Sequence, residues 1–64
     1  MNIKDSLQIR LDLINNYIEI YKKQAIEEIE KEDIIPATSD LLMLRDFKEQ
    51  QLLIKQLLEI EEEW

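Results

Sequence analysis

The sequence predicts an all-α protein, an antiparallel two-helix hairpin that dimerises into a four-helix bundle. Two features of the composition favour helices. The 64 residues include no glycine and only one proline, and leucine, glutamate, glutamine and lysine are frequent. A third feature is the spacing of the apolar residues, which recur at alternating steps of four and three. This spacing is typical of a helix that packs lengthwise against another helix.

The first helix is expected over residues 3–32. Its apolar residues form one continuous stripe, because steps of three and four return the chain to the same face of a helix. We expect this stripe to pack against the second helix. The predicted core residues of the first helix are Leu7, Leu11, Ile14, Ile18, Tyr21, Ala25 and Ile29.

A connection is expected over residues 33–38, around Pro36. Proline disfavours a helical conformation in the residue before it, so the first helix should stop ahead of Ile35. Thr38 or Ser39 suits the capping position of the next helix, because a hydroxyl oxygen accepts a hydrogen bond from a free first-turn N–H group. So short a connection favours antiparallel helices.

The second helix is expected over residues 39–62. Its core stripe is less regular than the first, because Gln50 and Gln51 interrupt it. The predicted core residues are Met43, Phe47, Ile54 and Leu58. Both helices belong to a single domain, residues 1–64, since a chain of this length holds one core at most.

Each predicted helix carries more apolar surface than one stripe can bury. A hairpin buries one stripe per helix, and a large exposed apolar patch marks a contact surface. Two hairpins that pair as a four-helix bundle would cover the second stripes. Either stripe suits self-association or the binding of a different protein. The residues of this predicted surface are Ile9, Leu13, Tyr17, Ile20, Leu42, Leu53, Leu57, Ile60 and Trp64.

The composition also limits how so small a fold gains stability. A chain of about this length buries only about 60% of its unfolded surface, and small folds add disulfides, metals or oligomerisation. This chain has no cysteine and no histidine. Disulfides and thiolate or imidazole metal sites are therefore excluded. Homodimerisation is the remaining route.

The same absences argue against an enzyme. No imidazole is present to activate a hydroxyl nucleophile, and no thiol nucleophile exists. Without glycine the chain lacks the loops that cradle phosphate groups or calcium ions. We therefore expect no catalytic residue, no cofactor, no metal and no small-molecule substrate.

The charge argues against two further kinds of partner. The chain has 15 acidic and 8 basic residues, a net charge of −7, which opposes binding to nucleic acid and to anionic lipid. It lacks an apolar run of about 18 residues and a signal-peptide pattern, so we expect a cytoplasmic protein. The acidic residues crowd the ends of both helices, where they form either a solvated end or an acidic surface. They are Glu27, Glu28, Glu30, Glu59, Glu61, Glu62 and Glu63.

Together these observations predict a small non-enzymatic regulator or adaptor that binds another protein through an apolar helix face. Apolar anchors would provide the affinity, and the acidic ends would orient the partner. Two alternatives stay open. The chain can be a purely structural bundle that assembles only with itself. It can also be an acidic mimic of nucleic acid that inhibits a basic DNA-binding protein.

Overall fold

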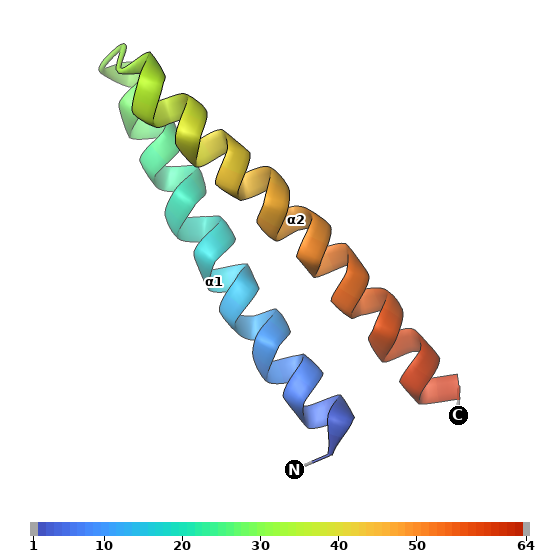
Figure 1. The fold of residues 1–64 in the computed structure, drawn as a ribbon. Coiled ribbons are helices and arrows are strands. Elements are labelled where there is room, and N and C mark those ends of the chain that lie inside the picture. The colour runs from blue at the N-terminus through green and yellow to red at the C-terminus, as the bar shows by residue number, and fades with distance from the viewer. Residues whose placement is uncertain (1, 64) are drawn as a thin grey trace.

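The chain folds into two helices that lie side by side. The computed structural model describes residues 2–63, with the backbone alone for residues 61–63. Helix α1 spans Ile3–Glu30 and helix α2 spans Ile34–Glu63. The beginning of α1 and the end of α2 lie at the same end of a rod that measures 49 × 16 × 11 Å (Figure 1). The predicted all-α hairpin is confirmed.

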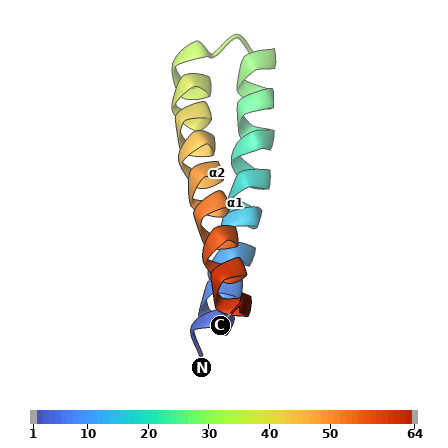
Figure 2. The same cartoon turned by 90° about the vertical axis from the view of Figure 1, so that its right-hand side faces the viewer.

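The helices wind slightly around each other. In Figure 1 they overlap near the connection and lie apart toward the termini. In Figure 2, which is turned by 90°, they lie apart near the connection and overlap toward the termini. Winding of this kind keeps a stripe with steps of three and four facing the partner helix along its whole length.

Helix α1 begins at a capping residue that the sequence analysis did not identify. The side-chain Oδ1 of Asn2 accepts a hydrogen bond from the backbone N–H of Asp5 at 2.8 Å. The backbone carbonyl of Asn2 accepts a second bond, from the N–H of Ser6 at 3.1 Å. Asparagine is among the preferred residues here, because its side chain satisfies an N–H group that has no partner inside the helix.

The connection is shorter than predicted and lies earlier in the chain, so the predicted range 33–38 is wrong. The chain reverses within residues 31–33. Two backbone hydrogen bonds close the turn, one from Glu32 N–H to the Ile29 carbonyl at 3.0 Å and one from Asp33 N–H to the Glu28 carbonyl at 2.9 Å. This pair of bonds is the Schellman motif, a common way to end a helix.

Pro36 lies inside α2, so the expectation that it interrupts the helical structure is wrong. Proline breaks a helix because it lacks an N–H group and clashes with the carbonyl four residues earlier. Neither cost arises in a first turn. The N–H groups there have no acceptor within the helix, and the residue four positions before Pro36 is Glu32, which precedes α2.

The predicted caps of the second helix are also wrong, because Thr38 and Ser39 lie within α2. Asp33 occupies the position before the helix. Its carbonyl accepts the first hydrogen bond of α2, from the N–H of Ala37 at 3.2 Å. The Thr38 hydroxyl donates instead to the Ile34 carbonyl, at 2.7 Å.

The core is a single seam between the two helices. The buried residues and the half-buried residues between them recur at steps of three and four on both helices. The buried residues are Leu11, Ile14, Ile18 and Ala25 of α1 and Ala37, Leu44 and Ile54 of α2. The half-buried residues that pack against them are Leu7, Tyr21, Phe47 and Leu58.

Two residues predicted for the core lie outside it, Ile29 with an exposed fraction of 56% and Met43 with 38%. In α1 the seam continues from Ala25 by a step of three, which brings Glu28 between the helices rather than Ile29. In α2 it passes through Leu44, which lies about 100° from Met43 around the helix. The predicted three-four spacing is correct. Ile29 and Met43 were placed in the seam because they are apolar, whereas Glu28 and Leu44 occupy the seam positions.

Candidate interaction surface

The surface predicted to contact another protein is exposed in the hairpin. Its described residues have exposed fractions between 44% and 58%. They are Ile9, Leu13, Tyr17, Ile20, Leu42, Leu53, Leu57 and Ile60. Trp64, which was predicted with them, lies outside the described residues.

An aromatic contact shows on which side of the hairpin the α1 stripe lies. The ring of Tyr17 stacks on that of Phe47, with centroids 5.3 Å apart and an interplanar angle of 21°. Phe47 also contacts Tyr21 in the seam, at 5.6 Å. Tyr17 therefore continues the core outward onto one long side of the rod.

Residues of α2 extend the same side. A helix turns about 100° per residue. Met43 therefore lies about 40° from Phe47 around α2, and Leu57 about 80° from it, both in the direction away from Leu44. Leu53 lies farther round in the same direction, on the outer edge of α2, where Leu42 and Ile60 also lie. The surface therefore spans both helices.

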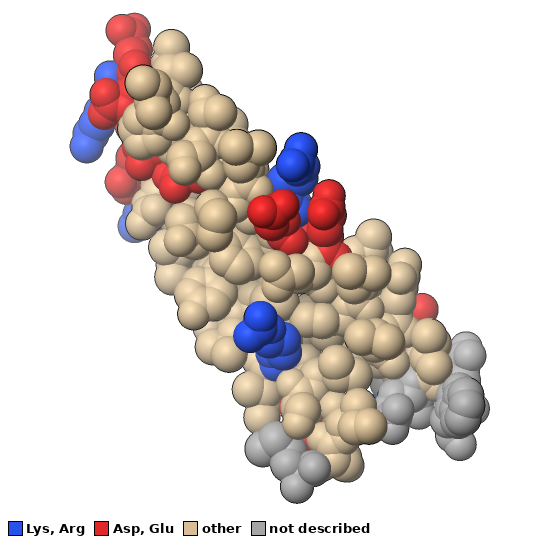
Figure 3. All heavy atoms as spheres, in the orientation of Figure 1, with Lys and Arg blue, Asp and Glu red and all other residues tan. Residues whose placement is uncertain are grey.

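This side of the molecule carries few charges. Figure 3 shows it as a largely uncharged surface that runs along the rod, with isolated groups of basic and acidic side chains. We call it the apolar face. Its residues are Ile9, Leu13, Tyr17 and Ile20 of α1 and Met43, Leu53 and Leu57 of α2. Sequence reasoning missed Met43, because that residue was assigned to the core.

One polar contact ties the two helices together near their middle. Nε2 of Gln51 donates a hydrogen bond to Oδ1 of Asn15 at 2.7 Å. Gln51 is half-buried and occupies the seam position between Phe47 and Ile54. The glutamine that interrupted the predicted stripe is thus part of the interface between the helices.

The acidic residues lie at opposite ends of the hairpin. Glu27, Glu28 and Glu30 belong to the last turn of α1, beside the connection, whereas Glu59 lies near the end of α2. The side chains of Glu61, Glu62 and Glu63 lie outside the described part of the chain. A single continuous acidic patch is therefore not formed by the described residues.

Two of the carboxyl groups meet between the helices. A hydrogen bond to the Asp40 carboxyl raises the pKa of Glu28, and burial and the negative charges of Asp40, Asp33 and Glu27 raise this pKa further. One oxygen of each carboxyl, Oε2 of Glu28 and Oδ2 of Asp40, is buried without a hydrogen-bond partner. Among the described residues, no group of three or more acidic, histidine or cysteine residues could hold a metal ion.

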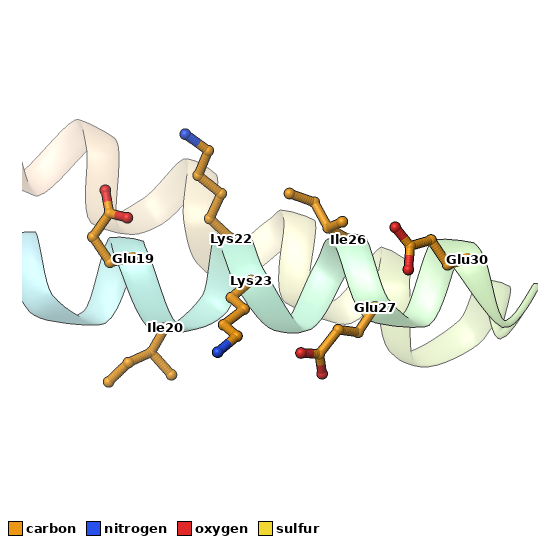
Figure 4. A pocket seen from close by; sticks show the side chains of 7 residues that line it. All are labelled: Glu19, Ile20, Lys22, Lys23, Ile26, Glu27 and Glu30. Carbon is orange, nitrogen blue, oxygen red and sulfur yellow. The ribbon is translucent and has the colours of Figure 1, made fainter.

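The hairpin also has a shallow hollow of about 590 Å³. All of its lining residues come from α1, and their side chains diverge around that helix (Figure 4). Glu19 and Lys22 extend to one side, and Ile20 and Lys23 extend to the other. Groups that diverge in this way do not converge on one reacting atom, so the hollow does not resemble a catalytic cleft.

In the described part of the chain, neither helix has a stretch long and apolar enough to cross a membrane. No family model, curated protein or solved structure matches the chain.

Proposed function

We propose that this chain is a non-enzymatic protein-interaction module that pairs with a second copy through the apolar face, and that it serves as a regulator or adaptor. The pair would be a four-helix bundle in which each hairpin covers the other. The observation that supports this most directly is the apolar face itself, a surface that spans both helices and is left uncovered by the hairpin.

The accessible area supports a second copy as the occupant. The surface of the chain is 5238 Å², whereas folded monomers of 7.8 kDa expose about 4,400 Å². The hairpin thus exposes roughly 800 Å² more than a globular monomer of its mass. A stable interface buries about 800 Å² on each partner. The excess is similar to the area that each partner buries in such an interface.

Charge supports the choice of this face for pairing. Two copies that each carry a net charge of −7 repel each other, and the repulsion is weakest where the facing surfaces carry few charges. The apolar face is such a surface (Figure 3). A two-fold axis through it would bring the same residues of both chains together, as closed dimers require.

The nucleic-acid mimic is less well supported. A mimic of this kind needs a row of negative charges along one surface, because a DNA-binding groove contacts successive phosphates. The acidic groups lie instead at opposite ends of a rod 49 Å long. An apolar face with few charges between them would contribute little to such binding.

A pair of variants tests the proposal. Leu13→Glu places a charge on the apolar face and should lower the mass in sedimentation equilibrium from that of a dimer to that of a monomer. Leu52→Glu is the control, because Leu52 is also an exposed leucine, at 58% against 45% for Leu13, but a turn of about 100° per residue places it on the side of α2 away from Met43 and Leu57. It should leave the dimer intact. Loss of the dimer in both variants, or in neither, contradicts the assignment of this face.

A further inference from the structure

The connection end of the hairpin carries a second apolar surface, separate from the apolar face. Ile34 and Ile35 begin α2 with exposed fractions of 75% and 85%. Beside them is a groove of about 500 Å³ between the two helices. The groove is lined by Ile29, Glu32, Ile34, Ala37, Thr38 and Leu41. We call this surface, with Ile35, the tip.

The tip is held in a defined conformation. The two hydrogen bonds of the Schellman motif fix the connection, and Pro36 fixes its own backbone angle in the first turn of α2. The hydroxyl of Thr38 is engaged by the Ile34 carbonyl, so this residue adds no free donor to the groove. A backbone that is already held in one conformation loses little entropy on binding, which favours contact with a partner.

The tip isoleucines are the most exposed large apolar side chains of the described residues. Asp33 precedes the helix, and the first turn of α2 itself contains no acidic residue. It presents instead two neighbouring aliphatic side chains that are more than 70% exposed. Neighbouring aliphatic side chains that are exposed together are available for burial against a partner.

The charges around the tip indicate the chemistry of that partner. Between residues 27 and 40 the chain has six acidic residues and one basic residue, Lys31. Glu32 is part of the groove wall itself. A second copy of this chain has the same acidic tip, so like charges would oppose tip-to-tip contact. Lysine and arginine side chains would complement it.

We propose that the tip binds a basic amphipathic segment of a different protein. Aliphatic side chains of the segment occupy the groove and contact Ile34 and Ile35, and its lysine or arginine side chains face the acidic groups around the groove. This inference deepens the proposed function, because it assumes an interaction module and names the partner's chemistry. The apolar face stays free to pair with a second copy.

Three synthetic peptides of about 18 residues, which is five helical turns, test the proposal against the full chain by fluorescence anisotropy. The first has leucine on one helix face and lysine on the other. The second replaces lysine with glutamate, and the third replaces leucine with serine. We expect the first peptide to bind at least about tenfold more tightly than either of the others, because both burial and charge contribute.

Variants locate the binding. The double variant Ile34→Ser/Ile35→Ser should weaken binding of the first peptide about tenfold or more. The control Ile3→Ser changes the same residue type at the first position of α1, with a similar exposed fraction of 66%, at the other end of the rod. It should change the affinity less than about twofold. Circular dichroism checks that both variants stay helical, as expected for exposed positions.

The outcomes separate this inference from the proposed dimer, since the mass of each variant is measured alongside. Equal affinity for the acidic and basic peptides, or equal effects of the tip and Ile3 variants, overturns the tip proposal even if the chain is a dimer. Tip-dependent binding of the basic peptide by a monomeric chain supports the tip proposal and overturns the dimer.

Discussion

Glu32 has a backbone conformation that its residue type does not favour. Its φ of 62° lies in the left-handed region, where a residue with a Cβ atom costs about 1–2 kcal/mol. Glycine is the usual residue at this place after a helix, because it has no Cβ atom. The chain contains no glycine, so the tight turn carries this cost.

Glu32→Gly should therefore stabilise the hairpin by about 0.5–1 kcal/mol, since glycine removes the steric cost but gains freedom in the unfolded chain. Urea unfolding followed by circular dichroism, at one fixed protein concentration, measures the effect. Glu32→Ala is the control, because it removes the same charge and keeps a Cβ atom. Stabilisation by alanine as large as that by glycine would show that charge, not backbone strain, is responsible.

The Glu28 and Asp40 carboxyls occupy positions in the seam where apolar residues occur elsewhere. Contact with Asp40 raises the pKa of Glu28 above its ordinary value of 4.5. A group whose pKa is raised on folding binds its proton more tightly in the folded state. Its stabilisation is complete below pH 4.5 and is lost as the pH rises through the raised pKa.

The hairpin should therefore be more stable in mildly acidic than in neutral solution, and Glu28→Gln should reduce this dependence. Glutamine cannot ionise, yet it can still form a hydrogen bond with Asp40. Thermal unfolding at a series of pH values measures the stability of the unaltered chain and of the variant. The difference between the two pH profiles separates the effect of Glu28 from that of the other carboxyls, including the neighbouring Asp33 and Glu27. Identical pH profiles would contradict the role of Glu28.

The two helices could be predicted because apolar periodicity shows which face of each is buried, and their antiparallel packing could be predicted because the connection between them is short. The α1 seam from Leu11 to Ala25 follows from that rule. The connection could not be predicted in the same way. Pro36 ends a helix or begins one with equal ease, and only the hydrogen bonds of the preceding turn decide between the two. Without glycine the turn gave no signal of its own.

The registers of the seam were harder to predict where polar residues enter it. Glu28, Asp40 and Gln51 all follow the three-four spacing, but their polarity hid them from a search for apolar stripes. Each has a cross-helix neighbour, an acidic partner for the first two and Asn15 for the third. Which polar residues find such partners depends on the alignment of the helices, which is set by the length of the turn.

Ile14 provides a test of the seam at the level of the helices, because it is 2% exposed and is the largest fully buried side chain of the described residues. Ile14→Val removes one methylene group from a packed site and should destabilise the hairpin by about 0.5–1.5 kcal/mol. Denaturant unfolding measures this loss. Ile3→Val is the control at an exposed position and should change stability by less than about 0.5 kcal/mol. Equal effects would contradict the seam.

At the scale of the whole molecule, the hairpin has more apolar surface than its own fold can cover. The sequence predicted this excess from the number of stripes, and the structure leaves those residues exposed. The sequence could not show that the α1 stripe and part of the α2 stripe share one side, because that requires the relative rotation of the helices. The Tyr17–Phe47 contact supplies it. The tip went unnoticed because its isoleucines were assigned to a loop.

The central claim is that a second copy covers the apolar face, and sedimentation equilibrium of the unaltered chain tests it most directly. We expect a mass of about 15.6 kDa, twice the 7.8 kDa of one chain, that falls toward the monomer value on dilution. A mass of 7.8 kDa that does not change from micromolar to millimolar concentration would contradict the claim.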